Sequence, residues 1–391
     1  MSRRPFWLLL AGVVLLALNL RPAAISVGPV LAEVIDGLAM SGSAASLLTS
    51  LPVLAFAVFG AVAPWLARVV GVHRVTLAGL VCVTVGLLAR AVTDHAAAFL
   101  GWSMLALAGM ATANVLLPSL VKLHFPRHVG RATSLYTTAL AVGLTSALVL
   151  TVPVTEATGS WRVGLGAWAV LAALATLPWL GLVLHDRHAE AGPRGISLWR
   201  VARTPIGLAM ALFFALQSLQ AYSIFGWFAL LWRDAGHSPA AAGALVGLVA
   251  GVSIPLSSWL PALAARTHHP RALLVAVVAC YPVAYAGLLV APYSGAVLWA
   301  LLVGVGCCTF PLVLTLIGLR ARTPAGTAAL SGFTQSAGYL LSVAGPFTVG
   351  TLYQATGGWT APLVLLALMS LPLLAVGLYA SGDRFLEDQL R

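Results

Sequence analysis

The sequence predicts an all-α polytopic membrane protein of twelve spanning helices, built as two parallel six-helix repeats. Three observations predict this fold class: the composition, the spacing of the apolar runs and an internal repeat. The chain has 391 residues, of which 60% are hydrophobic and 8% are charged, and its mean hydropathy is +0.99. Soluble domains carry about 25% charged residues, so the composition excludes an ordinary soluble domain.

Apolar runs of about twenty residues mark the expected helices in order along the chain. Only one connection between these runs is long, from about His185 to Thr204. The first span is expected from Phe6 to Leu31, and a polar turn follows it at 33–43. The twelve spans begin near residues 6, 43, 73, 96, 128, 161, 205, 239, 270, 294, 326 and 359. These limits predict an N-terminal six-helix bundle at 1–185, a cytoplasmic linker at 186–204 and a C-terminal six-helix bundle at 205–391.

Positive charges indicate the orientation, because Lys and Arg are retained on the cytoplasmic side of a membrane. With the N-terminus inside, 17 of the 21 Lys and Arg residues fall on the cytoplasmic side. Arg90, Arg162 and Arg233 fall outside, and Arg21 lies within the membrane. We therefore expect a multi-pass protein of the plasma or inner membrane with both termini in the cytoplasm. The net charge of +11 then reflects topology, and no nucleic-acid partner is expected.

Two sequence echoes indicate the internal repeat. The segment Pro64-Trp65-Leu66-Ala67-Arg68, with Arg74 after it, is echoed 197 residues later by Pro261-Ala262-Leu263-Ala264-Ala265 and Arg271. The segment Ala157-Thr158-Gly159-Ser160-Trp161 is echoed 198 residues later by Ala355-Thr356-Gly357-Gly358-Trp359. Repeats with an even number of spans run parallel and hold a substrate between them near the midplane, as in secondary transporters.

Short basic links after the second and eighth spans are candidate hinges for tilting the two halves. The candidates in these links are Arg68, Arg74, Arg266 and Arg271, and Pro22 within the first span is a further hinge candidate. Retention of topology alone explains these charges equally well, so both interpretations stay open.

Arg21 is the charge that the sequence places at the centre of a long apolar segment. A guanidinium near the midplane costs about 2.5–3.5 kcal/mol on insertion scales and persists where it faces a cavity, a partner or a ligand. No acidic residue is predicted at a comparable depth. An anion from outside the protein is therefore the first candidate partner. Pro22 follows directly and cannot donate to the Leu18 carbonyl, so the first span is expected to bend here and to free that carbonyl for Asn19 or a ligand.

Polar residues in the middle of other spans are further candidates for a binding cavity. Position 21 plus the repeat offset is Ser218, so Arg21 and the amides near Ser218 are expected to face each other. Interhelical hydrogen bonding is the alternative for any single amide or hydroxyl. The candidates are Asn19, Asn114, Thr137, Thr138 and Thr145 in the first half, and Gln217, Ser218, Gln220, Tyr222, Gln335 and Tyr339 in the second.

Other chemistry is not indicated by the sequence. All nine histidines fall in loops or at span ends, and no Asp or Glu lies within a predicted span, so the usual carrier of a proton symporter is missing. No nucleophile with a base and an orienting acid is found, nor an H-E-x-x-H pattern, so an enzyme is not expected. The four cysteines indicate neither a disulfide framework nor a metal site, and no cofactor is expected.

Four groups of residues carry a resemblance that extends over nearly the whole chain. They are Asn19-Leu20-Arg21-Pro22 with Ser26 and Pro29; Leu47-Leu48-Thr49 with Leu51-Pro52-Val53; Leu216-Gln217-Ser218 with Tyr222 and Trp227; and Ser331, Gln335, Gly338, Tyr339, Gly345 and Pro346. With them the chain resembles the cyanate permease and 2-nitroimidazole transporter branch of the major facilitator superfamily. The usual loop motif of the superfamily, Gly-x-Leu-Ala-Asp-Arg, is replaced by Pro64-Trp65-Leu66-Ala67-Arg68-Val69, a departure that is typical of this branch.

The resemblance implies the major facilitator fold with twelve spans and a small polar or anionic substrate. The main hypothesis is a monomeric secondary active transporter of a small anion such as cyanate. In it Arg21 binds the anion and the halves rock around a cage completed by Asn19, Gln217, Tyr222, Gln335 and Tyr339. The alternative is efflux of a neutral nitroheteroaromatic compound, with Tyr222, Trp227 and Tyr339 stacking on its ring. A membrane-embedded binding protein that senses without transport is the third class. The sequence leaves open the substrate, the direction of transport and the coupling ion.

Overall fold

The structure is a computed structural model that describes residues 3–125, 129–183, 196–266 and 270–390. In these residues the chain forms helices and no strand, as the composition predicts. It divides into two compact units, Met1–Gly192 and Pro193–Arg391. Most of the predicted linker, 186–195, lies outside the described residues, so its limits stay predictions; the described part of it contains a short helix, α10 (Leu198–Ala202).

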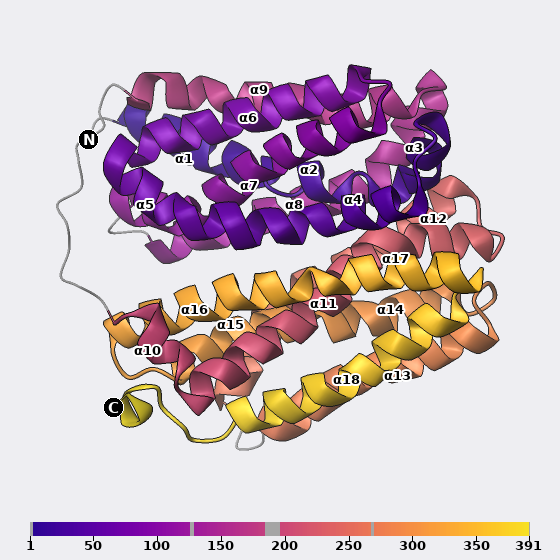
Figure 1. Ribbon diagram of the computed structural model, residues 1–391. Helices are drawn as coiled ribbons and strands as arrows, with labels where there is room; N and C mark the ends of the chain where they lie inside the picture. The colour runs from indigo at the N-terminus through magenta and orange to yellow at the C-terminus, as the bar shows by residue number, and fades with distance from the viewer. Residues whose placement is uncertain (1–2, 126–128, 184–195, 267–269, 391) are drawn as a thin grey trace. The chain divides into compact units, whose positions relative to one another are not determined.

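The first unit is a bundle of helices, some of them interrupted within a span (Figure 1). In chain order they are α1 (Arg3–Asn19), α2 (Pro22–Ile25), η1 (Gly28–Val30), α3 (Leu31–Gly37), α4 (Gly42–Ala55), the π-helical η2 (Phe56–Gly60), α5 (Ala61–Val70), α6 (Val72–Val92), α7 (Ala96–His124), α8 (Val129–Thr158) and α9 (Trp161–Leu182). Helix α6 packs between α7 and α9, and α1 packs on α8 and α9.

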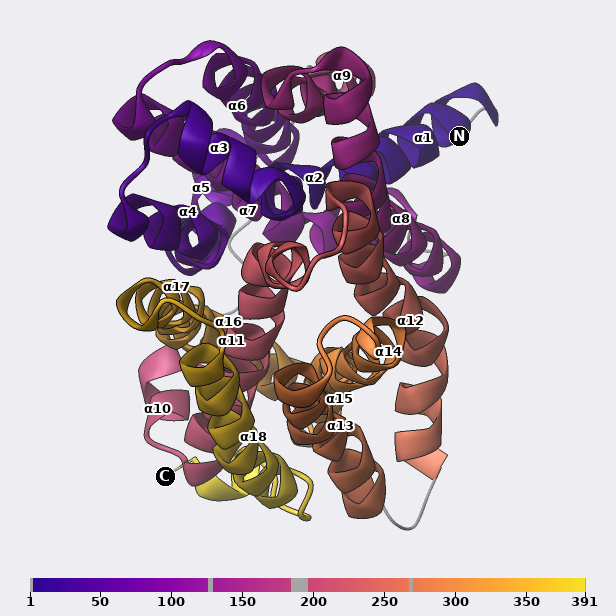
Figure 2. The same ribbon diagram turned by 90° about the vertical axis from the view of Figure 1, so that its right-hand side faces the viewer.

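The second unit is organised around α11 (Pro205–Asp234), most of whose side chains are buried. After α11 follow α12 (Pro239–Arg266), α13 (Pro270–Val290), α14 (Ala296–Cys307), α15 (Thr309–Leu319), α16 (Pro324–Ser342), α17 (Ala344–Thr356), α18 (Thr360–Ala380) and η4 (Glu387–Gln389). Helix α11 packs on α16 and α18, and Figure 2 shows α18 lying beside α13.

The helices agree with the expected spans to within a few residues at their starts. Eleven helical stretches of the described chain are long and apolar enough to cross a membrane. Helices α16 and α17, separated only by Val343, occupy the remaining predicted span over 324–356. The twelve-helix architecture is therefore confirmed.

Two sequence predictions were wrong: that the first span ends near Leu31, and that no Asp or Glu lies within a span. The expected polar turn begins in the structure only after Gly37, because α3 continues the helix with Leu31 and Val34 buried three residues apart. Glu33 and Asp36 consequently lie inside the first apolar stretch, Leu9–Gly37. Similarly, Glu156 and Asp234 lie in the last turns of α8 and α11. These carboxylates are at helix ends, and all except the half-buried Glu33 are exposed.

The repeated Ala-Thr-Gly turn has the same backbone conformation in both units. Gly159 and Gly357 each have φ of +65°, in the left-handed region that favours glycine. Each turn is followed by a tryptophan at the start of the next helix: Trp161 is the first residue of α9, and Trp359 is the N-cap residue of α18. The indole of Trp161 packs edge-on against Phe99, with ring centroids 5.9 Å apart. This shared turn supports the internal repeat that the sequence echo predicts.

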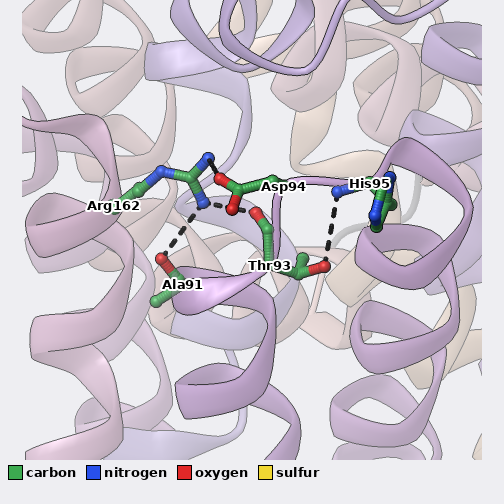
Figure 3. A network of polar contacts seen from close by, with 5 residues as sticks. All are labelled: Ala91, Thr93, Asp94, His95 and Arg162. Atoms are coloured by element: carbon green, nitrogen blue, oxygen red, sulfur yellow. Dashed lines mark hydrogen bonds and ion pairs between the residues drawn. The ribbon is translucent and has the colours of Figure 1, made fainter.

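Different polar contacts secure the two turns. In the first unit, Arg162 donates from Nη2 to Asp94 Oδ1 at 2.7 Å and from Nη1 to the carbonyls of Ala91 and Thr93 (Figure 3). This network ties the start of α9 to the loop between α6 and α7. In the second unit, Asp234 Oδ2 accepts from the Trp359 indole at 2.8 Å and from Tyr353 Oη at 2.7 Å. The same turn is thus closed by a cation in one unit and by a carboxylate in the other.

Candidate functional site

The first span is broken at the residue that the sequence singles out. Helix α1 ends at Asn19, and α2 begins at Pro22, with Arg21 as its N-cap residue. The Arg21 carbonyl accepts from the backbone N–H groups of Ala24 and Ile25, at 3.1 and 3.0 Å. The expected bend at Arg21-Pro22 is therefore present. It follows from the missing N–H of Pro22 and from the fixed φ of proline, which suits the first position of a helix.

The Arg21 side chain is half-buried. Among the described residues it has no hydrogen-bond acceptor and no carboxylate partner. Buried or half-buried guanidinium groups are ordinarily paired, since desolvation of an isolated charge is costly. This side chain thus keeps all five of its donors available to a ligand.

The Leu18 carbonyl, to which Pro22 cannot donate a hydrogen bond, lies against Gly143 of α8. A Cβ atom at position 143 would collide with the Leu18 carbonyl oxygen. Only glycine at this position of α8 allows the two helices to approach so closely at the break. The carbonyl that was expected to accept from Asn19 is therefore covered by the Gly143 backbone.

The Asn19 side chain bonds other carbonyls than that of Leu18. Its Nδ2 donates to the carbonyl of Leu15 within α1 and to the carbonyl of Leu171 in α9, both at 3.0 Å. Asn19 is 2% exposed and thereby ties the end of α1 to α9. The prediction that it bonds the Leu18 carbonyl is wrong, because its amide hydrogens are used by these two acceptors.

The other polar candidates of the first unit lie on α7 and α8. Asn114 is half-buried on α7 and has no hydrogen-bond partner within the described parts of the chain. Thr137 and Thr138 are exposed on α8. The hydroxyl of Thr145, two turns further along α8, is buried and has no partner in the described residues. Asn114 and Thr145 are therefore the members of this group with unused hydrogen-bonding capacity.

In the second unit the structure brings together the polar candidates of α11 and α16. The ring of Tyr222 lies edge-on to that of Tyr339, with centroids 6.4 Å apart. Phe214 also packs edge-on against Tyr339, at 4.8 Å. Gln335 donates from Nε2 to Ser331 Oγ at 2.8 Å, which leaves its carbonyl oxygen available.

Gln217 and Ser218 are neighbours on the same helix, each 2% exposed. Ser218 Oγ donates to Gln217 Oε1 at 3.2 Å. The oxygen of the Gln217 amide is occupied by this bond, and its Nε2 group remains available as a donor to another acceptor.

Trp227 and Gln220 are used in packing within the second unit. The Trp227 indole is 1% exposed and donates to the Pro346 carbonyl at 3.0 Å. Gln220 is fully buried; it accepts from Tyr285 Oη at 2.6 Å and donates to the Leu366 carbonyl at 2.7 Å. Gln220 thus joins α11 to α13 and α18, as the interhelical alternative proposes.

Three of the four candidate hinge arginines have side chains that the structure describes, and these lie on the surface. Arg68, Arg74 and Arg271 are exposed, and Arg68 Nε donates to the Pro64 carbonyl one turn earlier at 3.4 Å. Arg266 is the last residue of α12, and its side chain lies outside the described part of the structure. Their role in tilting the halves stays a prediction.

Two buried features had no signal in the sequence. The sequence places Arg90 at the outer end of a span, yet it is 0% exposed and donates to the Ala23 carbonyl and to Ser26 Oγ. His73 and His124 are 51 residues apart in sequence, and their Nε2 atoms are 2.8 Å apart. His124 lies beyond the apolar stretch that ends at Val121; burial, and then the charge of His73, lower its pKa to about 4. A rule that tests each span-end arginine for a polar break in a neighbouring span would have found Arg90.

No group of three His, Cys, Asp or Glu side chains suitable for a metal ion occurs in the described residues. The first unit has an unpaired guanidinium on a broken helix, and the second unit, taken by itself, has a set of amides and phenols on α11 and α16. Such groups bind small polar or anionic molecules by hydrogen bonds and charge.

Comparison with known proteins places the chain among transporters. The family model of the Major Facilitator Superfamily matches residues 8–346. The chain is 37% identical over 386 residues to the uncharacterized transporter YycB of Bacillus subtilis (strain 168), covering 97% of this chain and 95% of that protein. It is 32% identical over 378 residues to the 2-nitroimidazole transporter of Escherichia coli (strain K12), covering 96% of each. It is 27% identical over 374 residues to the cyanate transport protein CynX of the same organism, covering 95% of this chain and 97% of that one.

The fold agrees with this assignment. A bacterial homolog of the human lysosomal transporter Spinster superposes with a TM-score of 0.77 at 16% identity, covering 100% of this chain and 99% of that one. The nucleoside transporter NupG superposes with a TM-score of 0.77 at 13% identity, covering 97% of this chain and 99% of that one. The chain is therefore a transporter of the Major Facilitator Superfamily, and it belongs to the branch that contains the cyanate and 2-nitroimidazole transporters.

Proposed function

We propose that this transporter carries a small anion such as cyanate by rocker-switch alternating access, with Arg21 as the anchor of the anion. One observation carries the proposal: Arg21 is half-buried at the break of the first span and has no carboxylate or hydrogen-bond partner among the described residues. A cation in this position is costly unless something neutralises it. A transported anion would do so in each cycle.

Residues of the second unit complete the binding cage in this proposal. The Gln217 amide nitrogen and the Gln335 amide oxygen have capacity for a ligand, and the phenols of Tyr222 and Tyr339 complete the set. The internal repeat supports their inclusion, because it pairs Arg21 with Ser218. In the first unit, Asn114 is the additional candidate, since its amide is unpartnered in the described chain. Trp227 is left out of the cage, because its indole donor is occupied by Pro346.

The size of cyanate limits its affinity. The ion has three heavy atoms, and a ceiling of about 1.5 kcal/mol per atom permits only about 4.5 kcal/mol of binding free energy. The expected dissociation constant is then no tighter than about 0.5 mM. Binding of cyanate tighter than about 10 µM would exceed this ceiling and contradict the size argument.

The membrane potential constrains the direction of transport if the protein lies in the plasma or inner membrane, as the distribution of positive charge favours. A potential of about 100 mV, inside negative, opposes entry of a monovalent anion by about 2.3 kcal/mol. Net uptake therefore needs exchange for an internal anion, rapid consumption of the anion inside, or a coupled proton. Export of an anion needs no coupling.

Efflux of a neutral nitroheteroaromatic compound is the second candidate function. The 2-nitroimidazole transporter is 32% identical to this chain, against 27% for the cyanate transport protein. Tyr222, Tyr339 and Phe214 form an edge-on aromatic group in the second unit, which suits a flat ring. Arg21 would then donate to the nitro group.

The deciding experiment is uptake of radiolabelled cyanate into proteoliposomes, with and without an internal anion. It compares the wild type, Arg21→Gln and Arg320→Gln, because Arg320 is a buried arginine elsewhere in the chain. The proposal expects saturable uptake that other small anions inhibit, that Arg21→Gln removes at millimolar cyanate and that Arg320→Gln retains. Absence of wild-type cyanate flux together with 2-nitroimidazole efflux insensitive to added anions would establish the second function instead.

A further inference from the structure

Arg90 is a buried cation that belongs to a different helix from the proposed anion anchor. It lies in the last turn of α6 and is 0% exposed. Its Nη1 donates to the Ala23 carbonyl at 3.1 Å, and its Nη2 donates to Ser26 Oγ at 3.2 Å. Its Nε has no partner in the described residues, where no carboxylate pairs with this side chain either. A fully buried guanidinium whose Nε has no partner and which has no counter-ion in the described residues is an expensive structural element, which indicates a function.

Both acceptors of Arg90 belong to the break in the first span. Ala23 lies in α2, and Ser26 is the residue that caps the C-terminal end of α2. The backbone bonds between helices include none to the Ala23 carbonyl in the described chain. Arg90 therefore replaces the N–H group that a continuous helix would supply, in the way that basic side chains satisfy the last carbonyls of helices.

The same short segment carries Arg21. Helix α2 has only four residues, Pro22–Ile25, and Arg21 precedes it as N-cap. A segment so short has little helical stability of its own, so its position depends on what holds it. Before the break, the Leu18 carbonyl lies against the Gly143 backbone. After the break, the Ala23 carbonyl accepts from Arg90.

We propose that Arg90 is the positioning residue of the Arg21 site: by holding Ala23 and Ser26 it fixes α2 and with it the direction of the Arg21 guanidinium. The inference rests on the proposed role of Arg21 as the anion anchor. A positioning residue acts through the group that it orients, so its effect disappears when that group is absent. Lysine would replace Arg90 only in part, because an ammonium cannot span two acceptors as the planar guanidinium does.

The first test is a double-mutant cycle on cyanate transport in proteoliposomes. The variants are Arg21→Gln, Arg90→Gln, both together and Arg90→Lys, with Arg320→Gln as the control for loss of a buried arginine that bonds a carbonyl, here that of Ser381. We expect Arg90→Gln to raise the half-saturating cyanate concentration about tenfold or more, Arg90→Lys to restore part of it, and Arg320→Gln to leave it within about threefold. In the Arg21→Gln background, Arg90→Gln should add less than about twofold. Additive effects of the two substitutions would overturn the proposal.

The second test needs no substrate. Arg21→Cys is introduced into a chain whose four cysteines are replaced by alanine, and its rate of reaction with a small methanethiosulfonate reagent is measured with Arg90 and with Arg90→Gln. We expect the rate to change about fivefold or more when Arg90 is lost, and Ser26→Ala, which removes one acceptor and keeps the cation, to change it in the same direction. An unchanged rate in both variants overturns the positioning role.

The two tests separate the two proposals. A changed reaction rate at position 21, together with no cyanate flux in the wild type, would mean that Arg90 positions Arg21 in a transporter of another substrate. An unchanged rate, together with cyanate flux that Arg21→Gln removes, would mean that Arg21 binds the anion without this support. If Arg90→Gln does not fold, Ser26→Ala and Arg90→Lys carry the same comparison.

Discussion

The first span and its repeat counterpart, α11, differ in continuity and in charge. The first span is interrupted after Asn19 and carries Arg21 and Pro22 at the break. Helix α11 runs unbroken over 30 residues, with Ser218 and Leu219 at the corresponding positions and its only proline at the first residue. A proline in mid-span frees a carbonyl and forces the chain to reorganise. The comparison teaches that an Arg-Pro pair in mid-span distinguishes a broken helix that presents a cation from a continuous helix that presents neutral polar groups.

The break in the first span and the Gln220 network of the second unit also differ in how their buried polar groups are satisfied. In the second unit, Gln220 uses both ends of its amide on Tyr285 and on the Leu366 carbonyl. In the first unit, Arg21 has no partner in the described chain, and Arg90 leaves its Nε unbonded. Two cations without a carboxylate partner in the described residues therefore lie beside the break, whereas the Gln220 network is closed. Function is expected where the hydrogen bonding is incomplete.

The largest expected effect comes from substitution at the paired positions 21 and 218. Arg21→Gln should weaken binding of a transported anion by about tenfold to 100-fold, since hydrogen bonds to charged groups contribute about 1.5–3 kcal/mol. Ser218→Ala removes a neutral bond to Gln217 and should weaken binding by about threefold or less. Half-saturating concentrations from flux measurements compare the two. Equal effects at both positions would remove the asymmetry between the units.

The close approach at the break should be sensitive to a single methyl group. Gly143→Ala places a Cβ against the Leu18 carbonyl, and overpacking of this kind costs about 1–3 kcal/mol. The matched control is Gly251→Ala in α12, where a Cβ meets nothing within 4 Å; there alanine should be neutral or stabilising by up to about 1 kcal/mol. Thermal unfolding in detergent measures both variants. A Gly143→Ala variant as stable as Gly251→Ala would mean that the helices do not meet at this carbonyl.

The closed network of the second unit should fail when one member is removed. Tyr285→Phe leaves the buried Gln220 Oε1 without its donor, which costs about 1–3 kcal/mol. Tyr293→Phe, at a residue that is 58% exposed, should change stability by about 0.5 kcal/mol or less. Unfolding midpoints provide the comparison. Indistinguishable variants would show that Gln220 has another donor in solution.

A pH dependence of stability is also expected from the histidine pair of the first unit. The pKa of His124 is lowered to about 4 by burial and by His73, whereas an unfolded histidine titrates with a pKa near 6.5. Between these values the unfolded chain binds more protons than the folded chain, so stability should rise as pH increases from about 4 to about 6.5. His124→Gln should flatten this rise in thermal unfolding measured across the interval. A slope that is unchanged in the variant would assign the pH dependence to other groups.

Local sequence rules predicted the features that local residues determine. Arg21-Pro22 predicts the broken span because the cause, a missing N–H, lies in the adjacent residue. The repeated turn was visible as a sequence echo, because Gly159 and Gly357 both adopt the left-handed conformation that favours glycine. The starts of the spans follow from apolar runs in the same way.

Features that depend on tertiary contact were not predictable from one sequence. The choice of Asn19 to bond Leu171 rather than Leu18 depends on where α9 packs. Burial of Arg90 depends on α2 lying beside the last turn of α6, and the pairing of His73 with His124 joins helix ends 51 residues apart. Glu33 and Asp36 were placed in a turn because polarity was taken as the end of the helix, whereas buried Leu31 and Val34 extend it.

The most direct test of Arg21 as an anion anchor is the electrical current that cyanate evokes in proteoliposomes adsorbed to a solid-supported membrane. Transport of an uncompensated anion moves charge, so the wild type should give a current that saturates in the millimolar range. Arg21→Gln should raise the half-saturating cyanate concentration about tenfold or more at unchanged protein density, so that millimolar cyanate evokes little current, and Arg320→Gln should retain the wild-type response. A current with the same half-saturating concentration in Arg21→Gln as in the wild type would contradict Arg21 as the anion anchor.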